Sequence, residues 1–172
     1  MTQQISDLRV NPSSETIRIG PVEIRFLITA EDSGGSVAVF EGAVAGGRGL
    51  AAPAHSHDHY EETVYVTGGI LTFTVDGKAI DIGPGQALCI PRGAIHRFSN
   101  NGTEEAKAVC VVAPAAIGPE YFREAAEVIN AAAGGPPDRR TTEEIMRRHS
   151  LTPAPSASWR VGGESGPRPP RR

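Results

Sequence analysis

The segment HSHDHYEE holds three histidines and two glutamates within eight positions. His55 and His57 are two positions apart, so a β-strand would point both imidazoles toward the same face. Two imidazoles on one face are a common start for a transition-metal site. Glu61 and Glu62 follow, and a carboxylate on an apolar face needs a counter-charge such as a bound divalent ion. The segment indicates a metal site, with ordinary histidines and an exposed Glu-Glu pair as the alternative.

Strand parity selects which of the two glutamates would point inward. Glu62 shares a strand face with Val64 and Val66, whereas Glu61 shares the opposite face with Tyr65. If the valine face looks into the interior, Glu62 points inside and Glu61 points to solvent. The step from the second histidine to Glu62 is odd, so a turn or bulge must reset the face between them.

Two further histidines lie near the predicted site. His59 falls in the expected turn, so we place it at the rim of the pocket. His96 shares a strand face with Phe98 and can also look into the interior. Pro91 and Gly93 come just before it, and their turn geometry would aim the imidazole.

The chain around these residues consists of short apolar segments separated by glycine and proline. The 172 residues include 20 Gly and 14 Pro without a collagen period. The pairs Gly68-Gly69 and Asp76-Gly77 are strong two-residue hairpin signals. Strands at this spacing, with no helix between them, indicate an antiparallel sandwich or barrel. The predicted strands are 22–29, 36–44, 63–67, 70–75, 78–82, 86–90, 95–99 and 106–113, with EDSGG as a hairpin turn between the first two.

The periodicity changes from strand to helix after this region. Pro119 stands at a typical first helical position, and Tyr121, Phe122, Ala125 and Ile129 fall on one stripe of a helix. Residues 151–172 include five Pro and three Gly and carry four Arg against one Glu, which is typical of a disordered tail. The predicted division is a flexible N-terminal arm at 1–15, a β-barrel at 16–115, C-terminal helices at 116–150 (helices at 119–133 and 142–150) and a Pro/Arg-rich disordered tail at 151–172.

Composition argues against several classes of protein. The net charge of −3 is not that of a basic nucleic-acid-binding domain, and no apolar run is long enough for a spanning helix. The first residues lack the apolar stretch of a signal peptide. Cys89 and Cys110 are too few for a disulfide framework and are expected to be two buried thiols without a chemical role. We therefore expect a cytoplasmic protein that binds neither nucleic acid nor membrane.

Two motifs in the chain resemble those of the cupin superfamily. The first, G-x5-H-x-H-x4-E-x6-G, runs from Gly49 to Gly69, and the second, G-x5-P-x-G-x2-H-x3-N, runs from Gly85 to Asn100. No fixed position departs from the cupin pattern, and the resemblance covers about residues 18–125. The chain is most similar to single-domain bacterial cupins of the quercetin-2,3-dioxygenase-like group.

This resemblance implies a mainly β fold, the cupin jelly-roll barrel, with C-terminal α-helices packed outside. It implies that His55, His57, Glu62 and His96 bind one divalent metal ion, which in the family is Fe, Mn, Ni, Co, Cu or Zn. In the resembling dioxygenases the ligand glutamate also accepts a substrate proton, so Glu62 would be both ligand and base. The predicted pocket residues are Phe73, Phe98, Val64 and His59.

Three functions are consistent with such a site. The first is a mononuclear metal-dependent dioxygenase or oxidoreductase that acts on a small phenolic, flavonol-like or diketone-like substrate. The second is a redox-free metal-dependent isomerase or lyase, and the third is a non-catalytic module that binds a small ligand. Many cupins pair through edge strands, and residues 16–29 could cover an open edge, so we also predict a homodimer.

Overall fold

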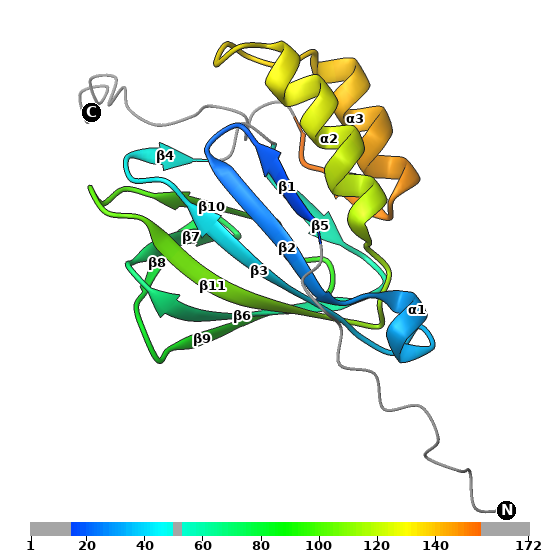
Figure 1. The fold of residues 1–172 in the computed structure, drawn as a ribbon, viewed down its shortest axis with the longest axis horizontal. Helices are drawn as coiled ribbons and strands as arrows, with labels where there is room; N and C mark the ends of the chain where they lie inside the picture. The colour runs from blue at the N-terminus through cyan, green and yellow to red at the C-terminus, as the bar shows by residue number, and fades with distance from the viewer. Residues whose placement is uncertain (1–14, 50–52, 156–172) are drawn as a thin grey trace, which may run out of the picture.

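Two antiparallel sheets face each other, with a pair of helices at one end (Figure 1). The computed structural model describes residues 15–49 and 53–155. The predicted arm lies outside the described residues apart from Glu15, and so does the predicted tail from residue 156 onward. The mainly β fold with C-terminal helices is confirmed.

The first sheet has six strands in the order β1-β2-β3-β11-β6-β9. Its strands alternate between buried and exposed positions, because one face looks into the interior and the other into solvent. Strand β11 pairs along its length with β3 on one side and with β6 on the other. The bounds are β1 (Thr16–Ile19), β2 (Val22–Ile28), β3 (Ala38–Val44), β6 (Glu61–Gly68), β9 (Ala87–Ile90) and β11 (Ala106–Ala113).

The second sheet has the order β12-β5-β10-β7-β8, and β4 also pairs with β10. The predicted hairpin at Asp76-Gly77 joins β7 to β8, and both residues have the positive φ that such a two-residue turn requires. The bounds are β4 (Arg48–Gly49), β5 (His55–His57), β7 (Leu71–Val75), β8 (Lys78–Ile82), β10 (His96–Asn100) and β12 (Leu151–Pro153).

The two C-terminal helices cover one end of the space between the sheets. Helix α2 (Pro119–Ala131) begins with proline at its first turn and buries Tyr121, Ala125 and Ile129, as the predicted stripe requires. Helix α3 (Arg139–Arg148) starts earlier than predicted, because the Asp138 side chain accepts a hydrogen bond from the backbone N–H of Thr141 and caps it. No helix in the part of the chain that the structure describes is both long and apolar enough to span a membrane.

Two predicted hairpin turns differ in the structure. Gly68-Gly69 joins β6 of the first sheet to β7 of the second, so the two strands do not pair. The turn between β2 and β3 contains a short helix instead of a tight reversal. Residues Ala30–Ser33 form α1 between β2 and β3. Thr29 accepts a hydrogen bond from the N–H of Asp32, and the Asp32 carboxylate accepts one from the N–H of Thr29. This reciprocal capping stabilises a helical turn where the glycine-rich sequence had indicated a tight reversal.

The predicted disordered tail is wrong at its beginning. Leu151–Pro153 form strand β12, which pairs antiparallel with β5 so that Leu151 lies opposite His57. Leu151 is 2% exposed, because helix α3 returns the chain to the edge of the second sheet, where this side chain joins the core. A proline-rich composition therefore did not prevent a short edge strand, a position that tolerates proline.

Candidate metal centre

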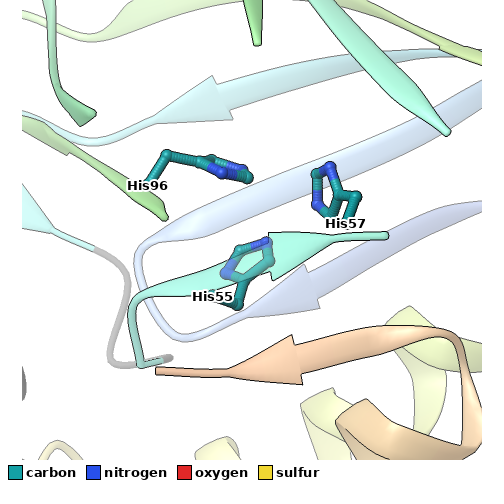
Figure 2. Close-up of side chains that lie close together, drawn as sticks. All are labelled: His55, His57 and His96. Carbon is teal, nitrogen blue, oxygen red and sulfur yellow. The ribbon is translucent and has the colours of Figure 1, made fainter. Parts of the chain in front are cut away.

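Three imidazoles meet between β5 and β10 (Figure 2). His55 and His57 come from β5 and His96 from the start of β10, and the strand register places His96 opposite His55. One ring nitrogen of each residue lies within 4.8 Å of the others, and the ring centroids are 4.6 to 5.0 Å apart. This geometry suits three nitrogen ligands of a single ion.

A carboxylate from the opposite sheet faces these imidazoles. The Oε2 atom of Glu62 lies 3.5 Å from Nε2 of His96 and 3.9 Å from Nε2 of His57. Its neighbour Glu61 points outward, where it forms an ion pair with Arg92 at 2.8 Å. Strand parity therefore selected the inward glutamate correctly. His57 and Glu62 are an odd number of positions apart and still face each other, because the turn after β5 carries the chain from the second sheet to the first.

The turn before β10 is held in place by backbone hydrogen bonds to the rest of the site. The N–H of Gly93 donates to the carbonyl of His57 over 2.8 Å, in a turn where Gly93 has a φ of 78°. The N–H of Ile95 donates to Oδ1 of Asp76 at 3.0 Å, and the N–H of Asp76 donates to the carbonyl of Ile95 at 2.8 Å. The residue before His96 is thus fixed from both sides, which aims the imidazole.

Backbone carbonyls set the tautomer of two of the imidazoles. Nδ1 of His55 lies 3.2 Å from the carbonyl of Pro53, and Nδ1 of His96 lies 3.0 Å from the carbonyl of Ala94. A carbonyl only accepts, so each Nδ1 carries the hydrogen and each Nε2 presents a lone pair. This arrangement is typical of metal-binding histidines. In the described part of the chain, the buried Nε2 of His96 and Nδ1 of His57 have no hydrogen-bond partner.

The charges at the site also fit a divalent cation. Burial, and after it the charge of the neighbouring imidazoles, lowers the pKa of His55 to about 3 and that of His57 to about 2. These imidazoles are therefore neutral, which is the form that binds metals. Glu62 is only 15% exposed, and its ion-pair contacts among the described residues are with His57 and His96. A bound divalent ion would supply the counter-charge that this carboxylate lacks.

A cavity of about 100 Å³ opens beside the imidazoles between the two sheets. Phe73, Phe98 and Val64 line it, as do His55, His57, Glu62 and His96. His59 is not among these lining residues, and its place at the rim of the pocket stays a prediction. It lies exposed in the turn between the sheets, because that turn points to solvent.

Two cavity residues, Cys110 and Tyr121, escaped the functional interpretation of the sequence, which had given a possible hydroxyl role at the pocket mouth to Tyr60. The Cys110 thiol lines the cavity, and burial and then the Glu62 charge raise its pKa well above the usual value. Burial and the same carboxylate raise the pKa values of Tyr60 and Tyr121, so both phenols stay protonated. Cys110 shares its strand parity with two buried neighbours in β11, and this signal could have found it. Cys89 is exposed, so the prediction of two buried thiols is wrong.

A cupin domain model matches residues 44–112, the stretch that carries the three histidines and Glu62. Among known proteins, SchB of Streptomyces halstedii is 34% identical over 98 residues, which cover 57% of this chain and 70% of SchB. The tetracenomycin polyketide synthase protein TcmJ of Streptomyces glaucescens is 29% identical over 113 residues, 66% of this chain and 75% of TcmJ. The polyketide synthase CurC of Streptomyces cyaneus is 39% identical over 82 residues, 44% of this chain and 53% of CurC.

Solved structures share the fold. A protein from Thermotoga maritima described as a predicted oxalate decarboxylase aligns with a TM-score of 0.54 and 21% identity, over 62% of this chain and 96% of that one. KdgF from Halomonas sp. aligns with a TM-score of 0.50 and 14% identity, over 58% of this chain and 86% of that one. At these identities the similarity concerns the fold alone. With the matched domain, the relative SchB and this fold taken together, the chain belongs to the cupin superfamily.

Proposed function

We propose that this cupin is a metal-dependent enzyme that acts on a small enolisable substrate, a phenol or 1,3-diketone of the kind found in polyketides. The observation that carries the proposal is the convergence of three imidazoles and one largely buried carboxylate on an apolar cavity. Perturbed ionisable groups beside a cavity are typical of reactive sites.

The proposed ligands are His55, His57, His96 and Glu62. A divalent ion held by them would act as a Lewis acid toward a substrate oxygen and, if redox-active, would exchange electrons with the substrate. The two sheets hold the donors on opposite sides, with the imidazoles on the second sheet and the carboxylate on the first. This leaves the space between them for a small molecule.

Glu62 is the proposed general base. Glu62 lines the cavity with its Oε2 close to the imidazoles, and the surrounding walls are largely apolar. A substrate hydroxyl bound there would transfer its proton to this carboxylate oxygen, which leaves an enolate or phenolate in the cavity.

The substrate class is supported by the relatives and limited by the cavity. Two of the named relatives, CurC and TcmJ, are described as polyketide synthase proteins, and polyketides are rich in phenols and 1,3-dicarbonyls. The cavity of about 100 Å³ is smaller than the cavity of about 150 Å³ that accommodates benzene in another protein. A polycyclic substrate therefore needs the α2 wall, with Tyr121 and Ala125, to move outward.

Oxygen-dependent chemistry of the dioxygenase type is our first proposal for the reaction, and redox-free isomerase or lyase chemistry is the second. The donor set supports both, because three imidazoles and one carboxylate bind iron, copper and manganese as well as zinc. The identity of the bound metal separates them. A redox-active ion with oxygen uptake supports the first, and turnover with zinc in anoxic buffer supports the second.

The test begins with elemental analysis of protein purified without added metal or chelator. We expect about one equivalent of a divalent transition metal in the wild type and in the His59→Ala variant, whose imidazole lies outside the site. We expect its loss in His96→Ala and in Glu62→Ala. Wild-type protein that stays metal-free after reconstitution would contradict the proposal. The loaded protein is then screened with substituted resorcinols and 1,3-diketones, with oxygen uptake recorded.

The homodimer and the cytoplasmic location stay predictions. Strand β1 forms one end of the first sheet in the part of the chain that the structure describes, and the predicted dimer would pair along this strand. Light scattering tests the dimer, and a mass of 18.1 kDa, that of one chain, would contradict it.

A further inference from the structure

Tyr60 has a buried hydroxyl without a partner. The residue is 0% exposed, and its Oη has no hydrogen-bond partner in the described part of the chain. Buried hydroxyls are almost always paired, because an unmade hydrogen bond costs the desolvation of the group. An unpaired hydroxyl that is kept inside a protein therefore requires a functional explanation.

The position of Tyr60 supplies this explanation. Its ring lies over the ring of His57, with the centroids 4.3 Å apart and the planes inclined by 19°. The same side chain lines the cavity that holds the imidazoles. The tyrosine therefore has two separable parts, a ring that packs on a candidate metal ligand and a hydroxyl that the protein leaves unused.

The neighbours of the hydroxyl indicate which kind of group it would bind. Glu62 is close enough for its charge to act on the Tyr60 phenol, yet no hydrogen bond joins the two. The other cavity walls near it are mainly aliphatic and aromatic carbon. A phenol hydroxyl in such a place donates to an acceptor that enters the cavity, and carbonyl, enolate and phenolate oxygens are acceptors of this kind.

We propose that Tyr60 donates its hydroxyl hydrogen to an oxygen atom of the substrate and thereby selects ligands with a carbonyl, enolate or phenolate oxygen beside the three imidazoles. This inference rests on the proposed function, because the substrate oxygen lies at the candidate metal centre. Sites with a hydrogen-bonding group of this kind discriminate strongly against analogues that lack the matching partner.

Two variants separate the two parts of the side chain. Tyr60→Phe removes the hydroxyl and keeps the ring on His57, whereas Tyr60→Leu removes the ring as well. Tyr65→Phe is the matched control, because Tyr65 is 45% exposed on the outer face of β6. The first readout is the melting temperature of the metal-free proteins, which needs no activity. The second is the dissociation constant of acetylacetone for the cobalt-loaded proteins, followed through the visible absorption of Co²⁺.

For Tyr60→Phe we expect a melting temperature about 2–4 °C higher in the metal-free protein, since an unpaired buried hydroxyl is removed. We also expect acetylacetone to bind about 10- to 100-fold more weakly, which is typical for a lost hydrogen bond to an anionic oxygen. The Co²⁺ content should stay at that of the wild type. Tyr60→Leu should also weaken Co²⁺ binding. Tyr65→Phe should change neither the melting temperature nor the affinity for acetylacetone.

The outcomes distinguish this inference from the proposed function. Acetylacetone affinity that differs by less than twofold between wild type and Tyr60→Phe would overturn the inference and leave the metal centre intact. A lower melting temperature of Tyr60→Phe would also overturn it, because the hydroxyl would then have a partner in the free protein. Failure of the wild type to bind Co²⁺ would refute the proposed function, and the inference with it.

Discussion

Replacement of Asn100 tests whether the last residue of the second motif is structural. Asn100 is 1% exposed and makes three hydrogen bonds through its side chain. Its Nδ2 donates to the carbonyls of Val44 at 2.9 Å and Glu104 at 2.7 Å, and its Oδ1 accepts from the N–H of Gly102 at 3.0 Å. The side chain thus joins the turn after β10 to the end of β3, away from any metal-ligand role.

The expected magnitude follows from these three bonds. Each contributes about 1 kcal/mol to the free energy of unfolding, so Asn100→Ala should lose about 3 kcal/mol, or about 6–12 °C in melting temperature. The loss is larger if the Val44 carbonyl stays buried without a partner. Asn100→Asp keeps the acceptor for Gly102 but loses both donors, so it should lose at least about 2 kcal/mol at neutral pH.

Urea denaturation of the metal-free variants measures these losses, with metal content determined in parallel. The matched control is Asn101→Ala, because Asn101 is exposed and makes one hydrogen bond to Oγ1 of Thr72 at 3.0 Å. We expect it to change the free energy of unfolding by less than about 0.5 kcal/mol. Wild-type stability of Asn100→Asp would refute the reasoning. An Asn100→Ala protein with the free energy of unfolding of the wild type but without bound metal would also refute it.

Three further predictions concern the site and its supports. The unfolded chain protonates histidine near pH 6.5, whereas His55 and His57 have folded pKa values of about 3 and 2. Metal-free protein should therefore lose stability as the pH falls below about 6.5, by up to about 1.4 kcal/mol per pH unit for each imidazole; a flat stability profile between pH 5 and 7 in urea melts would contradict this. Gly69 has a φ of 66°, and a Cβ there would lie 2.7 Å from the backbone of β11. Gly69→Ala should therefore lower the free energy of unfolding by well over the roughly 1–2 kcal/mol expected for Gly77→Ala, because Gly77 also has a positive φ but has open space around it. Equal melting temperatures for the two variants would argue against the close contact. Phe122 packs on two phenylalanines of the first sheet with centroids 5.3 and 5.6 Å away, so Phe122→Ala should lower the free energy of unfolding by about 2–3 kcal/mol and speed amide exchange in α2. Unchanged exchange in α2 would show that other contacts hold the helix.

Features that depend on local periodicity could be predicted from the sequence. Glu62 was selected over Glu61 because alternate residues of a strand point to opposite faces, whatever the partner strand is. The turn at Asp76-Gly77 was predictable because only a few residue types tolerate positive φ at both positions. The buried stripe of α2 followed in the same way from the helical repeat. The family resemblance supplied the proposed ligand set for the same reason, since its motifs are contiguous segments.

Features that depend on pairing between distant segments required the tertiary structure. The register of β5 with β10 brings His55 opposite His96, and no pattern within either strand specifies that register. Leu151 joins the core only because α3 returns the chain to β5, so composition alone assigned it to a tail. Tyr60 lies in a turn where strand parity does not apply, and its position over His57 follows from the crossing between the sheets. Local patterns thus determined which way the side chains point, and the long-range strand pairing decided which of them meet.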